Sequence, residues 1–286
     1  MKRTAMILVV LLISAASFAQ DNSKPGSQTP AAGQAAPPAA PQGKRPPQAK
    51  TQPEFEAYKT AMALTDPAAQ EKAADDFAAK FPDSELRPLL YKAAMHGYQA
   101  ANNGDKMMDM AHKVLSYDPD DPEALLGVAQ VLAERTHDTD LDKDQRLAEA
   151  KKDAQQALST IDTDVPTVGQ PADRIEAYKN FLRSEAYAVI GTIDFNGKDY
   201  PSAETNLQKS IDVFPQQPDP VAVFRLAVAL DMQNKYPEAM KYCNQAVDLT
   251  KDRPDSGVGK AARDEQSRLS KLASGTAPGQ APAPPK

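Results

Sequence analysis

The segment from Ser184 to Arg253 carries the same residue pattern twice, and this repeat limits the possible folds more than any other feature of the chain. When the segment is shifted by 36 residues, apolar positions align with apolar positions and small residues with small ones. Self-similarity with a period of roughly 20 to 50 residues predicts a stack of units that bury their apolar faces against their neighbours. The aligned pairs are Ile190 and Leu226, Gly191 and Ala227, Tyr200 and Tyr236, Ala203 and Ala239, and Leu207 and Cys243.

The chain between residues 53 and 272 has the residue spacing of amphipathic helices. Aromatic residues make up only 6% of the chain and Trp is absent, which favours helices over sheets. Asp-Pro pairs at Asp66, Asp121 and Asp219 predict helix starts, because Asp is a good N-cap and Pro suits the first helical position. We therefore expect an all-α fold, an α-solenoid of about four to five antiparallel helix pairs closed by a polar C-terminal capping helix.

Both ends of the chain differ in composition from the middle. Residues 1–19 have a basic start, a short apolar run and a small-x-small end at Ala19, which predicts a cleaved signal peptide. Residues 20–52 and 273–286 are rich in Pro and Ala and are expected to form a disordered linker and a disordered tail. The helical domain is thus predicted for residues 53–272, in a protein secreted across the inner membrane into the periplasm.

The composition and the motifs favour binding over catalysis. The formal net charge of −6 argues against a nucleic-acid partner, because such binding requires clustered Lys and Arg. The sequence has no Gly-rich phosphate loop, nucleophile elbow or His-Glu-x-x-His motif, so we expect no enzyme activity, no cofactor and no small-molecule substrate. The single cysteine, Cys243, takes the place of Leu207 in the repeat and is expected to be a buried thiol.

The two clean repeats resemble tetratricopeptide repeats (TPRs), a family of helix pairs about 34 residues long. Small residues such as Gly191 and Ala203 stand where this family needs close helix crossing, and a larger side chain there would force the helices apart. Asp194 departs from the pattern, which has an apolar residue at that position. The matching motif positions are Tyr187, Ile190, Gly191, Tyr200, Ala203, Leu207, Ser210 and Pro215 in one unit, and Val223, Leu226, Ala227, Leu230, Tyr236, Ala239, Cys243 and Ala246 in the next.

The resemblance implies that the first helices of the pairs line a concave groove, which holds an extended peptide or a partner helix. Some family members grip a C-terminal carboxylate with Lys and Asn in this groove, but other residue types occupy those positions here. Phe224 is the best candidate anchor, because desolvated aromatic residues dominate interface energies; packing inside the fold is the alternative for it. The groove positions implied by the resemblance are Glu123, Leu126, Gln130, Ala188, Thr192, Phe195, Val221, Phe224 and Val228.

An acidic insertion after residue 135 has the carboxylate spacing of a calcium-binding loop. Lys143 stands where that motif needs Gly, and its charge would lie beside the ion. A solvated acidic turn before the next helix is therefore the favoured interpretation, and a calcium site is the weaker one. The candidate ligands are Asp138, Asp140, Asp142, Asp144 and Glu149.

Together these features predict a non-enzymatic scaffold outside the cytoplasm that binds a protein or peptide through the concave face of the solenoid. Two alternatives stay open. One is a membrane-tethered structural or assembly factor of the cell envelope that keeps its N-terminal segment as an anchor. The other is a calcium-dependent binding module. Membrane contact is expected only for the tethered form.

Overall fold

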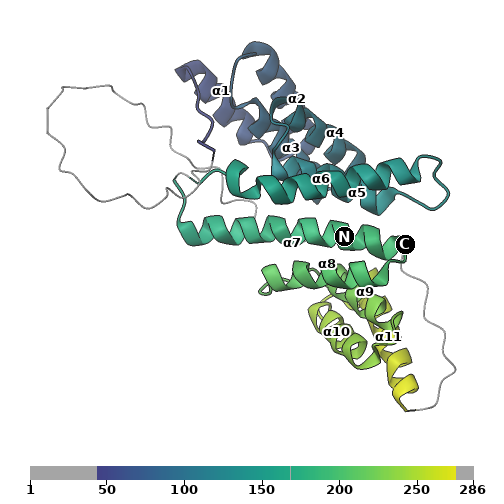
Figure 1. Cartoon of the computed structure of the whole chain (residues 1–286). Coiled ribbons are helices and arrows are strands. Elements are labelled where there is room, and N and C mark those ends of the chain that lie inside the picture. The colour runs from purple at the N-terminus through teal and green to yellow at the C-terminus, as the bar shows by residue number, and fades with distance from the viewer. Residues whose placement is uncertain (1–43, 168, 275–286) are drawn as a thin grey trace, which may run out of the picture. The chain divides into compact units, whose positions relative to one another are not determined.

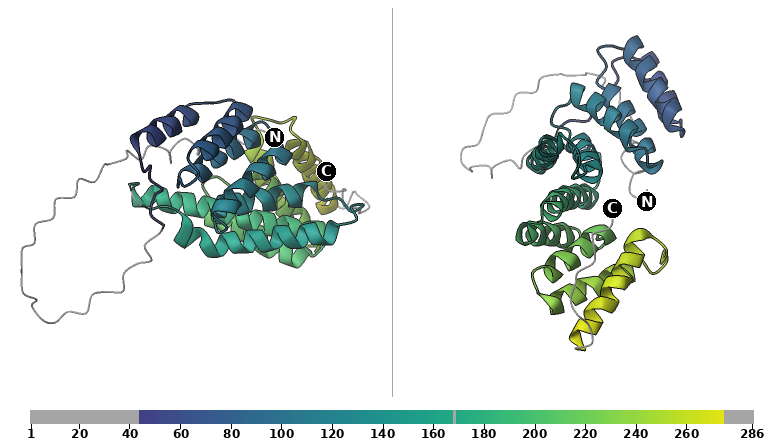
Figure 2. Two further views of the ribbon diagram at one scale, coloured as in Figure 1. Left: turned by 90° about the horizontal axis from the view of Figure 1, so that it is seen from above. Right: turned by 90° about the vertical axis from the view of Figure 1, so that its right-hand side faces the viewer.

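The computed structural model describes residues 44–167 and 169–274, and every regular element in these ranges is an α-helix (Figures 1 and 2). The chain divides into two compact units. The first extends to Pro119 and also includes residues 162–172, and the second comprises residues 120–161 and the chain from Asp173 onwards. Within the units, consecutive helices pack against each other as adjacent pairs. The predicted all-α fold of helix pairs is therefore confirmed.

The first unit is built on four helices in its described residues. They are α1 (Gln52–Met62), α2 (Pro67–Lys80), α3 (Arg87–Ala100) and α4 (Gly104–Tyr117). The α3 helix packs on both α2 and α4, while α1 contacts α2 and α3 (Figure 2). The order in space thus follows the order in the chain, as expected when each helix buries its apolar side against its sequence neighbours.

The second unit contains the clean repeats. Here α9 packs on α8, α10 and α11, and α10 also packs on α11. The last three residues of α6, residues 162–164, belong to the first unit. The helices are α5 (Pro122–Arg135), α6 (Lys143–Asp164), α7 (Ala172–Asn196), α8 (Tyr200–Val213), α9 (Pro220–Asp231), α10 (Tyr236–Leu249) and α11 (Gly257–Ala273).

The three Asp-Pro pairs begin helices, as the sequence predicts. Asp66, Asp121 and Asp219 are the N-caps of α2, α5 and α9, and each side chain accepts a hydrogen bond from a backbone N–H of the first turn. The proline that follows each of them lies in the first turn, where the helix makes no use of its missing donor. An N-cap of this kind stabilises a helix by about 0.5–2 kcal/mol.

Three turns, between α3 and α4, between α7 and α8 and between α9 and α10, share one backbone conformation. Asn102, Lys198 and Asn234 adopt left-handed φ values of 57°, 62° and 60°. Such a residue ends a helix and lets the following N–H reach back to a free carbonyl of the last turn. These hydrogen bonds run from Asn103 N to Tyr98 O, from Asp199 N to Asp194 O and from Lys235 N to Leu230 O, at 2.9, 2.9 and 3.0 Å.

Small residues let the paired helices of the second unit approach closely. Ala203 and Ala239, which occupy equivalent positions of the two repeats, are both fully buried. Gly191 of α7 faces Leu207 of α8, and a Cβ atom at position 191 would lie 2.7 Å from the Leu207 Cγ atom. The small positions of the repeat are therefore contact points between helices, which is the reason the sequence suggested for them.

The C-terminal helix α11 closes the second unit with a buried ion cluster as well as with apolar contacts. Leu269 packs into the core at 2% exposure. Arg268 Nη2 lies 2.5 Å from Asp231 Oδ2 of α9 and 2.8 Å from Glu265 Oε1. Glu265 is fully buried, although the sequence predicts a polar helix with a thin apolar side. Its burial is tolerated because Arg268 pairs with it; an unpaired buried charge is strongly destabilising.

Candidate functional site

A short basic segment before α1 lies on the first unit. Residues 44–50, called the basic strap below, have the sequence Lys-Arg-Pro-Pro-Gln-Ala-Lys and no regular secondary structure. Pro46 and Pro47 remove two backbone donors and disfavour a helix, which keeps the chain extended between its cations. All three cations, Lys44, Arg45 and Lys50, donate to oxygen acceptors of the unit. The strap is thus a peptide segment bound by its own chain.

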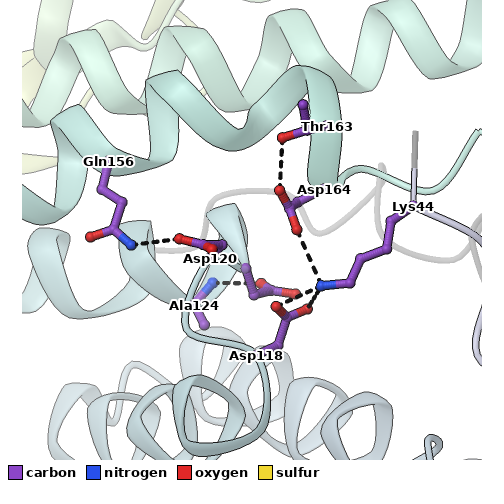
Figure 3. A network of polar contacts seen from close by, with 8 residues as sticks. Lys44, Asp118, Asp120, Ala124, Gln156, Thr163 and Asp164 are labelled. Carbon is purple, nitrogen blue, oxygen red and sulfur yellow. Dashed lines mark hydrogen bonds and ion pairs between the residues drawn. The ribbon is translucent and has the colours of Figure 1, made fainter. Parts of the chain in front are cut away.

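Lys44 joins two carboxylates at the ends of two helices (Figure 3). Its Nζ atom lies 2.6 Å from both carboxylate oxygens of Asp118 and 3.1 Å from Asp164 Oδ1. Asp118 is the C-cap of α4 and Asp164 is the last residue of α6, so both carboxylates lie at the negative end of a helix dipole, where a cation is favoured. The Lys44 backbone N–H also donates to Thr163 O at 2.9 Å.

Arg45 and Lys50 bind the loop between α2 and α3. Arg45 Nη2 donates to Glu85 Oε1 at 2.6 Å, and the other Glu85 oxygen accepts from the backbone N–H of Gln48 at 3.3 Å. Lys50 Nζ donates to the carbonyl oxygen of Asp83 at 2.7 Å. Glu85 therefore contacts both a side chain and the backbone of the strap. The three carboxylates that contact the strap cations, Glu85, Asp118 and Asp164, are called the acidic acceptor site below.

Glu54 fixes the point at which the strap meets α1. It is 3% exposed, and its two carboxylate oxygens accept from the Ser84 hydroxyl at 2.5 Å and from the Lys50 backbone N–H at 2.8 Å. The N-cap of α1 is Thr51, which accepts from the Glu54 N–H. Because this cap lies after the strap, the start of α1 does not depend on the strap cations.

The charges of the site reinforce one another. Burial lowers the pKa of Lys44, but its hydrogen bonds and ion pairs with Asp118 and Asp164 outweigh that effect and raise it. The hydrogen bond from Arg45 holds the pKa of Glu85 below its ordinary value. The Lys44 and Arg45 side chains remain 45% and 65% exposed, and ion pairs this exposed are individually weak. Several weak contacts, and no single strong one, therefore hold the strap.

No local sequence pattern reveals this site. Residues 44–50 belong to the Pro- and Ala-rich segment that is expected to form a linker, and the concentration of cations there is the local signal that the sequence offers. The acceptors Glu85, Asp118 and Asp164 are 40, 74 and 120 residues away from the cations that they bind. Pairing over such separations is decided by how the helices pack.

The groove positions implied by the family resemblance are mostly buried within the second unit. Phe224 is 2% exposed and belongs to the core cluster that also contains Leu207 and Leu226. Its side chain therefore packs inside the fold. Arg225 Nη1 donates to the Thr192 hydroxyl at 2.8 Å. Glu123, Gln130 and Val221 are partly exposed. The remaining groove positions are buried: Leu126, Ala188, Thr192, Phe195 and Val228.

Asp194, where the repeat pattern has an apolar residue, accepts hydrogen bonds from two neighbouring helices. Its side chain is 5% exposed and receives Lys151 Nζ of α6 and Asn206 Nδ2 of α8, both at 2.8 Å. A buried carboxylate is stabilising only when it is paired and hydrogen-bonded in this way. Asp194 therefore links α6, α7 and α8, and its role is structural.

The acidic insertion does not gather its carboxylates around one point. Asp138 pairs with Lys143 at 2.6 Å, and Asp140 accepts from the His137 backbone N–H at 2.8 Å. The α6 helix already begins at Lys143, so Asp144 and Glu149 are helical residues. Within residues 44–167 and 169–274, no group of three or more His, Cys, Asp or Glu side chains could hold a metal ion. The geometry thus gives no support to the calcium alternative.

The predictions for the chain ends rest on the sequence pattern alone. The signal peptide (residues 1–19) lies outside the described residues, as do residues 20–43 of the linker and 275–286 of the tail. In the part of the chain that the structure describes, no helix combines the length and the apolar character needed to cross a bilayer.

Comparisons with known proteins do not assign the chain to a family. No protein-family model matches it, and no curated protein matches it. Among solved structures, the chain is similar to the assembly chaperone of RpL4 (Acl4), at 13% sequence identity and a TM-score of 0.37; the match covers 77% of this chain and 99% of that one. A likeness this low carries no function to this chain. The class that the fold defines is an all-α protein of paired helices, and its candidate site is the acidic acceptor site that holds the basic strap.

Proposed function

We propose that this chain is a non-enzymatic scaffold that binds another protein or peptide. The observation that supports this function is the basic strap, an extended segment that the first unit holds through side chains and backbone groups at its helix ends. Acceptors that the folded chain already holds at the ends of helices and in the short loop between α2 and α3 need little ordering when a peptide binds, which favours affinity. The mechanism is capture of an extended chain, and no covalent bond is made or broken.

The surface proposed for capture is the acidic acceptor site of the first unit. The concave groove that the TPR resemblance implies is a weaker candidate, because most of its residues are buried in the second unit. Glu123, Gln130 and Val221, which are partly exposed, are the groove positions that a partner could still reach. Loops at helix ends suit peptide capture because they can vary without disturbing the helices that carry them.

We also propose that the protein acts outside the cytoplasm, in a bacterial periplasm, because residues 1–19 have the pattern of a signal peptide. N-terminal sequencing of the protein from its native envelope tests this proposal. A mature N-terminus at Gln20 is expected. An intact Met1 in the membrane fraction would instead favour the tethered structural or assembly factor.

Co-purification tests the scaffold function. The tagged full chain is cross-linked in the envelope fraction, and bound proteins are identified by mass spectrometry. We expect wild type to recover a defined partner. The variant Glu85→Gln/Asp118→Asn/Asp164→Asn should recover at least about fivefold less of it, because these charges contact the bound segment. The matched control Asp142→Asn/Asp144→Asn/Glu149→Gln removes the same charge from exposed positions and should retain the partner. Recovery no higher than with an unrelated helical protein would contradict the scaffold function.

A further inference from the structure

The acidic acceptor site is electrostatically incomplete without a cation. Asp118 and Asp164 both contact one ammonium nitrogen, at 2.6 and 3.1 Å. Without Lys44, two like charges would lie close together at the negative ends of two helices, where neither is favoured. An ammonium group removes this repulsion, so the pair of carboxylates selects a lysine-like cation.

Glu85 adds a requirement for a peptide. It accepts from the Arg45 guanidinium and from the backbone N–H of Gln48, so its occupant needs a side-chain cation and an extended main chain together. The two residues between these contacts are Pro46 and Pro47, which lack backbone N–H groups and leave no donor unsatisfied on the way. The site therefore fits two adjacent cations followed by prolines.

The part of the strap that carries Lys44 and Arg45 can leave the site while the N-cap of α1 stays in place. The side chains of Lys44 and Arg45 are already 45% and 65% exposed, and water can replace the contacts of such groups at little cost. The cap of α1 is made by Thr51, which follows the strap. Release of Lys44 and Arg45 thus breaks exposed ion pairs and hydrogen bonds, while the hydrogen bond from the Lys50 backbone N–H to the buried Glu54 can stay in place.

The strap is joined covalently to α1, and this connection gives it a high local concentration at the acidic acceptor site. A tethered segment of this kind excludes a free peptide that makes only the same contacts. We infer that the acidic acceptor site binds a basic, proline-containing peptide of a partner protein, and that the basic strap competes with that peptide as a built-in occupant. The inference rests on the proposed scaffold function and specifies the chemistry of the partner and its control.

Fluorescence anisotropy with a labelled synthetic peptide of residues 44–51 tests this competition in the full chain. Wild type is compared with a strap variant, Lys44→Ala/Arg45→Ala/Lys50→Ala, after circular dichroism has shown equal helical content. We expect the strap variant to bind the probe about tenfold more tightly or better, because the tethered competitor is gone. Adding salt should weaken this binding, since ion pairs at the surface are screened.

The acceptor carboxylates are tested in the background of the strap variant. Adding Glu85→Gln/Asp118→Asn/Asp164→Asn should weaken probe binding by about tenfold or more, because the probe cations lose their partners. Adding Asp142→Asn/Asp144→Asn/Glu149→Gln, an equal change in net charge, should leave it unchanged. If the triple strap variant loses helical content, Lys44→Gln alone should still tighten probe binding relative to wild type.

Three results would overturn the inference. Equal affinity of wild type and strap variant would show that the strap is not a competitor. An equal loss of affinity with both sets of carboxylate substitutions would show general attraction by negative charge and no defined site. Absence of probe binding by every variant would also overturn it, while a partner recovered by cross-linking would leave the scaffold function standing.

Discussion

Gly191 of α7 lies so close to Leu207 of α8 that a Cβ atom at position 191 would be 2.7 Å from the Leu207 Cγ atom and 3.0 Å from its backbone nitrogen. Leu207 is fully buried and belongs to the core of the second unit. Neither neighbour is the free end of a flexible side chain, so the helices themselves would have to move to admit a methyl group. This contact sets the spacing of the α7 and α8 pair.

Gly191→Ala should therefore destabilise the protein, even though alanine is the better helix former. Overpacking a core costs about 1–3 kcal/mol, and the gain in helix propensity returns at most about 1 kcal/mol. We expect a net loss of about 1 kcal/mol in the free energy of unfolding, measured by urea denaturation. Gly257→Ala at the start of α11, where a Cβ atom would meet nothing within 4 Å, is the control and should cause no loss.

Phe224→Ala should act on stability, because the ring is buried in the core of the second unit. Truncating a buried Phe costs about 3–5 kcal/mol through lost transfer energy and the cavity left behind. Thermal denaturation followed by circular dichroism measures this loss. Tyr236→Ala, which removes the aromatic ring of a residue that is 43% exposed, should cost far less. A Phe224→Ala protein with wild-type stability would mean that the ring is not a core residue.

Acid should weaken the first unit through two carboxylates of α2. Burial raises the pKa of Glu71 and of Asp75, but hydrogen bonds from a tyrosine and a lysine outweigh it and hold each pKa below its ordinary value of 4.5 and 3.8. Each of these carboxyl groups therefore has a lower pKa in the folded state than in the unfolded state. The stability that the two groups contribute is fully present above the unfolded pKa and is lost as the pH falls through the folded pKa. The donors are Tyr98 and Lys106 for Glu71, and Tyr91 and Lys113 for Asp75.

Urea denaturation between pH 7 and pH 3 should accordingly show stability falling below about pH 4.5. The variant Glu71→Gln/Asp75→Asn should be less stable at pH 7 and should lose less on acidification, because it has fewer depressed carboxyl groups to protonate. Asp76→Asn, which removes an exposed carboxylate paired with Lys72 in the same helix, is the matched control. A double variant with the same acid profile as wild type would contradict the role given to these contacts.

Cys243 should be unreactive in the folded protein. Its thiol is fully buried and donates to the Ala262 carbonyl oxygen at 3.0 Å. Burial, together with the nearby Glu265 carboxylate, raises the pKa of the thiol from 9.0 to about 12, and the thiolate is the reactive form. A maleimide reagent at pH 7 should label native protein slowly and unfolded protein fast. Leu141→Cys in a Cys243→Ala background places a thiol at a fully exposed position and should react at once.

Local and periodic features of the sequence were enough to predict the helix pairs. The Asp-Pro caps and the spacing of apolar residues act within a few positions of the chain, so they can be read without knowing the fold. The small residues Ala203 and Ala239 were identified from the repeat alone, and both are fully buried. Asp194 was recognised only as a departure, because its partner Lys151 is 43 residues away.

The candidate site could not be predicted from the sequence, because its interacting residues are also far apart in the chain. The sequence by itself determined that this chain forms stacked helix pairs, since each unit buries its apolar face against its neighbour in the chain. Only the tertiary structure decided that Phe224 is a core residue and that Lys44 meets Asp118 and Asp164. Burial and charge pairing depend on which distant segments the packed helices bring together, and no local pattern carries that information.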